Sequence, residues 1–347
     1  MGAIDRELLR RLPKAELHCH LDGSVRATTL IRLGKEYGRA MPKSDPIALR
    51  EYMIVRDARN LEDYLARFET TLSVMQSAEA LERIAFELAE DAHQDGVWYI
   101  EVRFSPVLNI LEGLALHEVI EAVARGLAAA EREYGVIGRI IVTALRTLPP
   151  ETSVELARLA VTYRERGVAG FDLAGAELGN PASVHVEAFE YARSNDLACT
   201  CHAGEGDGGH SVREAVHVCG AHRIGHGTRL FEDRSLMEFV NDRRIPIEIC
   251  LTSNVQTRAA ASYARHPVRQ YFDAGLNVVL NTDNRLMSGT TLTDEYMHAA
   301  THLNFTFAEL AKVALNGFES AFLPWRLRQV LIDRARRTIA GLSGDKR

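Results

Sequence analysis

Two histidines separated by a single residue stand near the start of the chain, within residues 15–23 (AELHCHLDG). Alternate residues of an extended strand point to the same side, so His18 and His20 are predicted to aim their imidazole rings at one point while Cys19 faces away. Neutral imidazole is a common metal ligand, and two rings at this spacing can bind one ion without distorting the backbone. The pattern leaves two interpretations open: a metal site, or a strand end whose two histidines face a polar cavity.

Polar and ionisable residues also stand at the ends of several later strand-like runs, where a metal site would need its remaining ligands. These ends carry Gly175, His202 with Glu205, His226, the run Thr252-Ser253-Asn254, and Asp283 with Asn284. Apolar strands that serve only as a core do not require such ends. Their repetition therefore favours the metal site over an incidental pair of histidines.

The segments that must position these residues alternate between strands and helices. Apolar strand-like runs are predicted at the opening stretch and at residues 97–104, 137–145, 170–175, 197–202, 223–227, 245–250 and 276–283, each followed by helical sequence. This alternation indicates a parallel sheet covered on both faces. Eight such units favour a closed (β/α)8 TIM barrel with additional helices over an open doubly wound sheet, and no G-x-G-x-x-G follows the first strand.

We expect one barrel domain over residues 1–347, because no linker divides the chain. In a barrel, functional residues collect at the C-terminal ends of the strands, so the polar residues above are predicted to meet there. Around the barrel, residues 49–53 are expected to form only a short turn, and Ser153 and Ser211 are each expected to begin a helix. One continuous helix is expected from the strand at 245–250 through Tyr271.

Composition places the chain among ordinary soluble globular proteins. Of its 347 residues, 46% are hydrophobic and 25% are charged, and the formal net charge is −6. The negative balance and the lack of a basic run argue against nucleic-acid polymers as partners. No apolar run reaches the ~18 residues that span a bilayer, and the N-terminus lacks a signal-peptide core, so a cytoplasmic protein without a membrane partner is expected. The five cysteines are expected to be reduced core residues.

Five blocks of sequence together resemble the adenosine deaminase family of the amidohydrolase superfamily. The blocks are HCHLDG at 18–23, HAGE at 202–205, HRIGHG at 222–227, SN at 253–254 and NTD at 281–283. One H-x-H block would be weak, whereas five blocks in the family's order and spacing are highly specific. The resemblance implies a barrel that binds one Zn²⁺ per chain and hydrolyses the 6-amino group of a purine nucleoside.

The resemblance also implies roles for the matching residues. His18, His20, His202 and Asp283 correspond to the zinc ligands, and three nitrogens with one oxygen leave the open position that a catalytic zinc needs for water. Zinc lowers the pKa of such a water towards neutrality. Glu205 corresponds to the acid that protonates purine N1, so it must be protonated when substrate binds.

His226 corresponds to the histidine that orients or deprotonates the water, and Asp283 is expected to hold that water by a hydrogen bond. His20, Asp22, Gly175 and Asn284 are expected to contact the substrate, with Gly175 at purine N3 and Asp22 at a ribose hydroxyl. Structural alternatives stay open at three positions: a core histidine at 226, a loop acid at 205, and a helix N-cap at 22. An apolar stripe is interpreted either as helix packing or as a lid over the substrate: Leu61, Tyr64, Leu65 and Phe68.

The chain departs from the family pattern after Asp283, where an aspartate and a proline are usual and Asn284 and Arg285 stand instead. The usual aspartate is thought to donate to purine N7 as a protonated acid. An asparagine amide donates without a raised pKa, so this contact can survive. Arg285 adds a positive charge that either pairs with a nearby acid or meets a substituent of the substrate. Residues 171–175 lack the bridging lysine of binuclear relatives, so a mononuclear site is expected.

The leading hypothesis is a zinc-dependent deaminase of adenosine and 2'-deoxyadenosine. Its partner is then a small-molecule substrate, and the protein can be an oligomer. A rival of the same class acts on a 5'-modified adenosine such as aminodeoxyfutalosine of the menaquinone pathway. A different class is a non-catalytic barrel that binds a nucleoside, and a third hypothesis is a hydrolase of unrelated amides.

Overall fold

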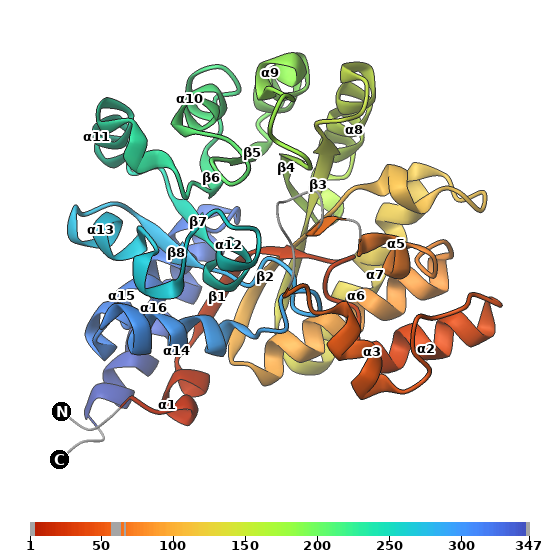
Figure 1. The fold of residues 1–347 in the computed structure, drawn as a ribbon, viewed down its shortest axis with the longest axis horizontal. Helices are drawn as coiled ribbons and strands as arrows, with labels where there is room; N and C mark the ends of the chain where they lie inside the picture. The colour runs from red at the N-terminus through yellow and green to blue at the C-terminus, as the bar shows by residue number, and fades with distance from the viewer. Residues whose placement is uncertain (1–3, 57–63, 66, 345–347) are drawn as a thin grey trace.

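A barrel of parallel strands forms the centre of the computed structural model, which describes residues 4–56, 64, 65 and 67–344 (Figure 1). The strands follow one another around the barrel in chain order, and each neighbouring pair is parallel. Their bounds are β1 Lys14–His20, β2 Val97–Phe104, β3 Ile137–Leu145, β4 Val168–Ala174, β5 Ala198–Ala203, β6 Arg223–His226, β7 Ile247–Ile249 and β8 Val278–Leu280. The predicted (β/α)8 barrel is confirmed.

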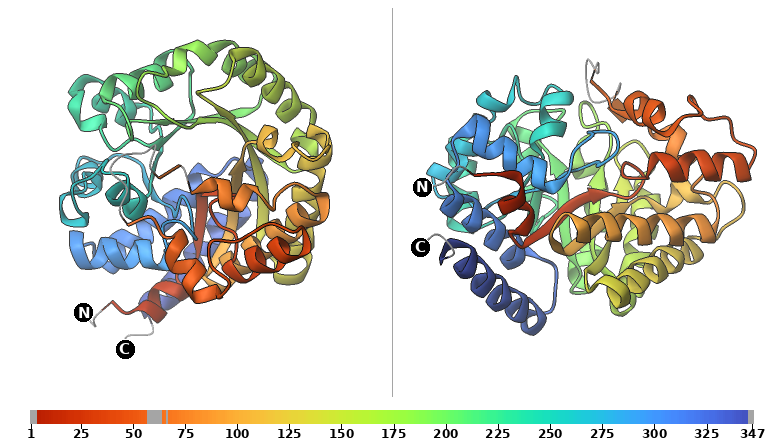
Figure 2. Two further views of the ribbon diagram at one scale, coloured as in Figure 1. Left: turned by 45° about the vertical axis from the view of Figure 1, so that its right-hand side comes forward. Right: turned by 90° about the horizontal axis from the view of Figure 1, so that it is seen from below.

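Helices surround the barrel and cover the outer face of its sheet, as the views from three sides show (Figures 1 and 2). Apolar residues on their inner faces pack against the Val- and Ile-rich strands, which is why both faces of the sheet read as apolar in the sequence. The α-helices are α1 Arg6–Arg11, α2 Ala27–Glu36, α3 Pro46–Met53, α5 Phe68–Leu72, α6 Ala78–Gln94, α7 Leu116–Tyr134, α8 Pro150–Thr162, α9 Val186–Ser194, α10 Gly209–His217, α11 Arg234–Asp242, α12 Leu251–Gln256, α13 Val268–Asp273, α14 Leu292–Leu303, α15 Phe307–Ser320 and α16 Trp325–Gly344.

The seam between β8 and β1 closes the barrel. Cys19 and Asp283 form a parallel bridge, in which His20 N donates to Asp283 O at 2.7 Å and Asp283 N donates to His18 O at 2.9 Å. The register of β1 against β2 shifts between Glu16 and Cys19, which marks a bulge. Strict alternation therefore fails at that point, and Glu16 and Cys19 both contact the hydroxyl of Thr282.

Buried charges fill part of the barrel interior. Arg223 donates to Glu248 at 2.6 Å and pairs with Glu101, and all three side chains are buried. Arg103 lies beside them and donates to Glu248 at 2.8 Å. Removing one partner from such a buried network typically costs about 3–5 kcal/mol, because a charge is left uncompensated. The network therefore holds the strands in one register.

Several helix boundaries differ from the predictions. Residues 46–53 form a full α-helix because Pro46 stands at its first turn and the Asp45 side chain caps the Ala48 N–H, so the predicted turn is wrong. Ser153 lies inside α8 and contacts the His185 ring, since the helix already begins at Pro150. The remaining two errors are a start of α10 at Gly209 rather than Ser211, and two helices, α12 and α13, where one was expected.

All five cysteines are free and buried, as predicted. Cys19, Cys201 and Cys250 pack in or beside strands, and burial raises the pKa of the Cys19 thiol to about 12. Such thiols are inert packing residues rather than nucleophiles. Among the described residues, no helix is both long and apolar enough to cross a lipid bilayer.

Candidate functional site

Three histidine rings and one carboxylate converge at the C-terminal end of the barrel. His20 Nε2 lies 3.2 Å from His202 Nε2 and 3.3 Å from Asp283 Oδ1, and His18 Nε2 lies 3.4 Å from the same oxygen. The side chains come from β1, β5 and the end of β8, which the closing seam brings together. The structure thus places all four residues predicted as metal ligands around one point.

Two buried carboxylates fix the orientation of two of these rings. Glu248 Oε2 lies 2.9 Å from His18 Nδ1, and Asp172 Oδ2 lies 3.1 Å from His202 Nδ1. Arg103 donates to both carboxylates. Burial alone would raise the pKa of Glu248, but the neighbouring guanidinium groups outweigh it and hold that pKa well below its usual range.

These two supporting residues were not among the predicted site residues, although the sequence contains a signal for them. Asp172 and Glu248 each interrupt an otherwise apolar strand run, Phe171-Asp172-Leu173 and Ile247-Glu248-Ile249. An acid in the middle of a strand that is covered on both faces needs a specific partner. Here those partners are histidines of the site.

The chemistry of this cluster fits a metal ion. An ionised carboxylate can only accept, so His18 and His202 carry their hydrogen on Nδ1 and turn the Nε2 lone pair towards the centre. His18 Nε2 is buried without a hydrogen-bond partner among the described residues. Lone pairs that face one another and the Asp283 carboxylate at these distances repel unless a cation lies between them. The nitrogen and oxygen donors suit a mononuclear Zn²⁺ site.

His226, at the end of β6, also reaches this cluster. His18, His202, His226 and Asp283 offer ligand atoms that all lie within 4.8 Å of one another. Its Nε2 lies 3.3 Å from Glu205 Oε2, and its Nδ1 lies 3.0 Å from the Asn254 amide nitrogen. With His20, five groups thus surround a centre for which four ligands were predicted.

Two residues of the site adopt a backbone conformation that side chains rarely allow. The φ angles of His226 and Asp283 are +60° and +61°. Left-handed geometry at residues other than glycine costs energy and is concentrated at functional sites, where it aims a side chain that the strand direction alone would not. Here both residues turn towards the cluster.

Glu205 lies beside the cluster in the loop after β5. Burial, together with the nearby Asp283 and Glu177 carboxylates, raises the pKa of Glu205 well above its usual value. The Thr257 hydroxyl lies 3.0 Å from Glu205 Oε1 and also 3.0 Å from the Ser253 carbonyl oxygen. The hydroxyl has one hydrogen and the carbonyl can only accept, so a protonated Glu205 that donates to Thr257 satisfies both contacts. Glu205 is thus suited to hold a proton at neutral pH.

Glu177, in the loop after β4, holds the backbone around Glu205 and was not among the predicted site residues. Its carboxylate accepts from the N–H groups of Gly204 at 2.6 Å, Glu205 at 3.0 Å, Gly206 at 2.6 Å and Asp207 at 3.2 Å. Four successive N–H groups that face one carboxylate make an anion-binding turn. No local pattern marks it, because the acid and the turn belong to different loops.

A cavity of about 300 Å³ opens beside the cluster. Asp22 and Asn284 line it, and the Oδ1 atom of each is buried without a hydrogen-bond partner among the described residues. Burial raises the pKa of Asp22 to about 7. Buried polar atoms without partners at a cavity are suited to a polar ligand, which would supply the missing bonds.

Glycines shape two walls of this cavity. A Cβ atom at Gly23 would lie 1.6 Å from Asn284 Oδ1, so only glycine lets the Asn284 side chain occupy its place. Gly175 also lines the cavity, and its φ of +98° is a conformation that disfavours any side chain. The residues predicted to contact the substrate, His20, Asp22, Gly175 and Asn284, therefore all line one cavity.

Two interpretations are wrong: that Arg285 meets a substituent of the substrate, and that Asp22 is a helix N-cap. Arg285 does not line this cavity; it pairs with Glu16 and lies 3.4 Å from Asp95 Oδ2, because these buried acids attract its charge. Asp22 is not a helix N-cap, since α2 begins at Ala27 and its N-cap position is Arg26.

The apolar stripe after the first loop lies partly outside the described residues, because Leu61 is not among them. The three other members, Tyr64, Leu65 and Phe68, line the cavity. The Tyr64 hydroxyl is 2.9 Å from Ser288 Oγ. This placement supports the lid interpretation over packing that is unrelated to the site.

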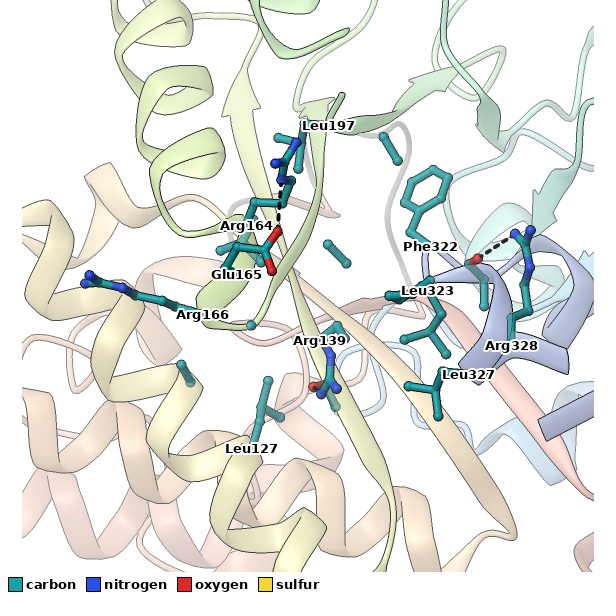
Figure 3. A pocket seen from close by; sticks show the side chains of 18 of the residues that line it. Leu127, Arg139, Arg164, Glu165, Arg166, Leu197, Phe322, Leu323, Leu327 and Arg328 are labelled. Atoms are coloured by element: carbon teal, nitrogen blue, oxygen red, sulfur yellow. Dashed lines mark hydrogen bonds and ion pairs between the residues drawn. The ribbon is translucent and has the colours of Figure 1, made fainter. Parts of the chain in front are cut away.

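A second cavity of about 690 Å³ lies at the opposite end of the barrel (Figure 3). It is bordered by the N-terminal ends of β3, β4 and β5, and by Phe322 and Leu323 after α15. Several of its charged side chains have local partners: Arg164 pairs with Glu165, and Arg328 donates to the Ala321 carbonyl. In this fold, the N-terminal end of the barrel serves stability, whereas chemistry takes place at the other end.

A (β/α)8 barrel whose strand ends assemble a His- and Asp-rich metal-type cluster beside a buried acid defines a metal-dependent hydrolase. Comparison with known proteins specifies which one. A model of the family described as adenosine deaminase matches residues 13–338. The chain therefore belongs to the adenosine deaminase family, and it is a hydrolytic deaminase.

Two curated relatives support this assignment. The "Adenosine deaminase" of Mycobacteroides abscessus is 41% identical over 348 residues, which covers 95% of this chain and 96% of the relative. The "Probable adenosine deaminase" of Dictyostelium discoideum is 44% identical over 322 residues. That match covers 92% of this chain but only 42% of the longer relative.

Solved structures of similar fold are also deaminases or amidohydrolases. An adenine deaminase from Arthrobacter aurescens superposes with a TM-score of 0.88 at 28% identity, covering 94% of this chain and 99% of that one. A zinc-bound amidohydrolase from Burkholderia ambifaria gives 0.85 at 25% identity, covering 98% and 96%. The N6-methyl-AMP deaminase of Arabidopsis thaliana gives 0.84 at 28%, covering 98% and 100%.

Proposed function

We propose that this enzyme converts adenosine and 2'-deoxyadenosine to inosine and 2'-deoxyinosine with release of ammonia. The observation that carries the proposal is a buried carboxyl group, Glu205, whose surroundings raise its pKa well above the usual value, beside a metal-type cluster in the same cavity. Hydrolysis at purine C6 needs these two functions together, an acid for the ring and a source of nucleophilic water. The names of the curated relatives point to adenosine as the substrate.

The metal in this proposal is one Zn²⁺ held by His18, His20, His202 and Asp283. The zinc bound in the related amidohydrolase structure supports this choice of metal. When bound, the ion supplies a water molecule of lowered pKa. Asp283 suits the role, because its Oδ2 accepts from Ser253 Oγ at 2.6 Å while its Oδ1 faces the histidines.

Glu205 donates its proton to purine N1. Protonation there withdraws electrons from C6 and prepares it for attack, which is why the acid must be neutral in the resting enzyme. Burial and the nearby Asp283 and Glu177 carboxylates raise the pKa of Glu205 and so favour that neutral form. The Glu177 carboxylate, through the backbone of residues 204–207, keeps the acid at its place beside the cluster.

The cavity recognises a purine nucleoside through three positions. Asn284 donates its amide hydrogen to N7, the backbone at Gly175 approaches N3, and Asp22 accepts a hydrogen bond from a ribose hydroxyl. A sugar contact at Asp22 favours nucleosides over the free base adenine.

Charge in the cavity also separates the candidate substrates. Among the residues that the structure describes, the cavity lining contains no Lys or Arg, so a 5'-phosphate would find no cationic partner there. This favours nucleosides over nucleotides such as the substrate for which the Arabidopsis deaminase is named. A 5'-modified adenosine, such as aminodeoxyfutalosine, is the second candidate. Its 5' substituent carries a carboxylate, which would likewise find no Lys or Arg in the described lining, and this ranks it below adenosine.

Steady-state kinetics on the zinc-loaded protein test the proposal. We expect adenosine and 2'-deoxyadenosine to show kcat/KM values at least about 100-fold above those of adenine and N6-methyl-AMP. Adenine lacks the sugar that contacts Asp22, and the phosphate of N6-methyl-AMP has no cationic partner in the described lining. A higher kcat/KM for the 5'-modified nucleoside would make that compound the substrate. Turnover of none of the nucleosides would refute the proposal.

A further inference from the structure

The protonation pattern of His226 can be traced from an atom whose role is fixed. The backbone N–H of Val268 can only donate, and it lies 3.1 Å from His266 Nδ1. His266 is 3% exposed, and burial lowers its pKa to about 3, so the ring is neutral. A neutral ring that accepts at Nδ1 carries its hydrogen on Nε2. His266 is therefore an Nε2–H donor.

This hydrogen sets the orientation of the next side chain, Asn254. His266 Nε2 lies 3.1 Å from Asn254 Oδ1, and a donor there requires the oxygen of the amide to face it. The amide nitrogen must then point the other way, towards His226 Nδ1 at 3.0 Å. Asn254 is fully buried, so no solvent competes for either end.

We propose that Asn254 and His266 are positioning residues that hold His226 as the Nε2–H tautomer, so that His226 donates a hydrogen bond to the reacting oxygen instead of binding the metal or accepting a proton. The Asn254 amide donates to Nδ1, which must then be the bare nitrogen. The remaining hydrogen lies on Nε2, the atom 3.3 Å from Glu205 Oε2.

The histidines of the site are of two kinds, which differ in the partner at Nδ1. His18 and His202 face acceptor-only carboxylates at Nδ1, so their Nε2 atoms are bare and suited to a metal. His226 faces an amide donor at Nδ1, so its Nε2 carries a hydrogen and cannot be a ligand. Of the five converging groups, His20 rather than His226 is therefore the third histidine ligand of the metal. This inference rests on the proposed function for the reaction, but the tautomer itself does not depend on the substrate.

Nuclear magnetic resonance can detect the tautomer directly. The full-length, zinc-loaded protein is labelled with ¹⁵N at histidine, and the His226 signals are assigned by their loss in His226→Gln. We expect a protonated-type shift at Nε2 and a bare-type shift at Nδ1. A hydrogen on Nδ1 would overturn the proposal, whatever the activity of the enzyme on adenosine.

Substitutions test the positioning roles of Asn254 and His266 through enzyme activity. In Asn254→Asp, the carboxylate only accepts, so the His226 hydrogen should move to Nδ1 and kcat should fall by about 100-fold, the usual loss for a donor to a developing oxyanion. Zinc content should stay at one per chain. Asn304→Asp adds the same charge at the exposed end of α14 and should leave kcat unchanged.

A conservative replacement separates this role from a merely structural one. His266→Gln keeps an amide N–H that can donate to Asn254 and an oxygen that can accept from Val268, so it should retain kcat within about tenfold. His266→Leu removes both and should lose kcat with little change in KM. Equal kcat values for His266→Leu and wild type, or wild-type kcat in Asn254→Asp, would contradict the proposal. If a variant fails to fold, the wild-type spectrum still decides.

Discussion

At the scale of single residues, the second partner of each side chain determines what it can do. Carboxylates at Nδ1 suit His18 and His202 to the proposed metal site, whereas an amide donor at Nδ1 suits His226 to hydrogen-bond donation. Glu205 differs from an ordinary loop acid through burial and two neighbouring carboxylates, which raise its pKa well above the usual value. Identical residue types therefore acquire different chemistry from neighbours that lie far away in the sequence.

Glu205→Gln should abolish turnover while zinc binding persists, because glutamine cannot give a proton to purine N1. We expect kcat to fall by at least about 1,000-fold, near the upper part of the range for general acid catalysis. Metal analysis and kcat on adenosine provide the measurement. Glu238→Gln, at an exposed position of α11, is the matched control. Near-normal kcat in Glu205→Gln would show that another group is the acid.

Asn284→Asp should introduce a dependence of KM on pH that the wild type lacks at this position. Aspartate donates to purine N7 only when protonated, and its pKa is near 4 when exposed and higher when buried. Because the donor form is lost as pH rises, the ratio of KM at pH 8 to KM at pH 5.5 should exceed the wild-type ratio by about tenfold. Equal ratios in the two proteins would mean that Asn284 does not donate to the substrate.

At the scale of secondary-structure elements, loops from different strands assemble the site in pairs. The seam between β1 and β8 aligns His18 and His20 with Asp283. The loop after β4 supplies Glu177 to the loop after β5, which carries Glu205. The strands set the positions of these loops, so the precision of the site derives from the barrel rather than from the loops themselves.

Glu177→Gln should misplace the loop at residues 204–207 without removing any catalytic group. A glutamine side chain presents one acceptor and one donor, and the donor would face N–H groups of the loop. We expect kcat to fall by about 10- to 100-fold with zinc content unchanged, as misplacement of reacting groups by about 1 Å does. Glu187→Gln, on α9, is the control. Unchanged kcat would show that the loop holds its shape without this carboxylate.

At the scale of the whole molecule, the cluster stores unfavourable contacts that a bound metal relieves. The Nε2 atoms of His18 and His20 face the Asp283 carboxylate, and His202 Nε2 faces His20 Nε2. Arg103 and Arg223 pair with Glu248 behind this cluster. The metal should therefore stabilise the folded chain as well as enable catalysis.

Removal of zinc by a chelator should abolish activity and lower the thermal midpoint. Binding to the folded state alone stabilises it by about 4 kcal/mol when free zinc exceeds its Kd 1,000-fold. Calorimetry of chelated and reloaded protein measures the shift, and readdition of Zn²⁺ should restore both properties. Mg²⁺, which prefers oxygen ligands, should restore neither. An unchanged midpoint after verified metal loss would contradict a metal role for the cluster.

Much of the fold and part of the site could be predicted from the sequence, because the responsible signals are local. Apolar runs, each followed by helical periodicity, indicate the eight strands, and the polar residues at their ends identify the groups that meet at the barrel mouth. The predicted ligands are found this way because they lie at or near strand ends. His20 is the last residue of β1, His18 and His202 lie close to the ends of β1 and β5, and Asp283 follows shortly after β8. Boundaries such as the start of α3 were missed because a proline can begin a helix as well as interrupt a chain.

The tertiary structure alone decided which partner each polar side chain takes. Arg285 turned to Glu16 instead of the substrate, Glu177 reached a turn in another loop, and Asn254 came to lie between His226 and His266. These pairings join segments that only barrel closure and strand register bring into contact. Local sequence specifies what a residue can donate or accept, whereas the closed barrel determines which group stands within hydrogen-bond distance.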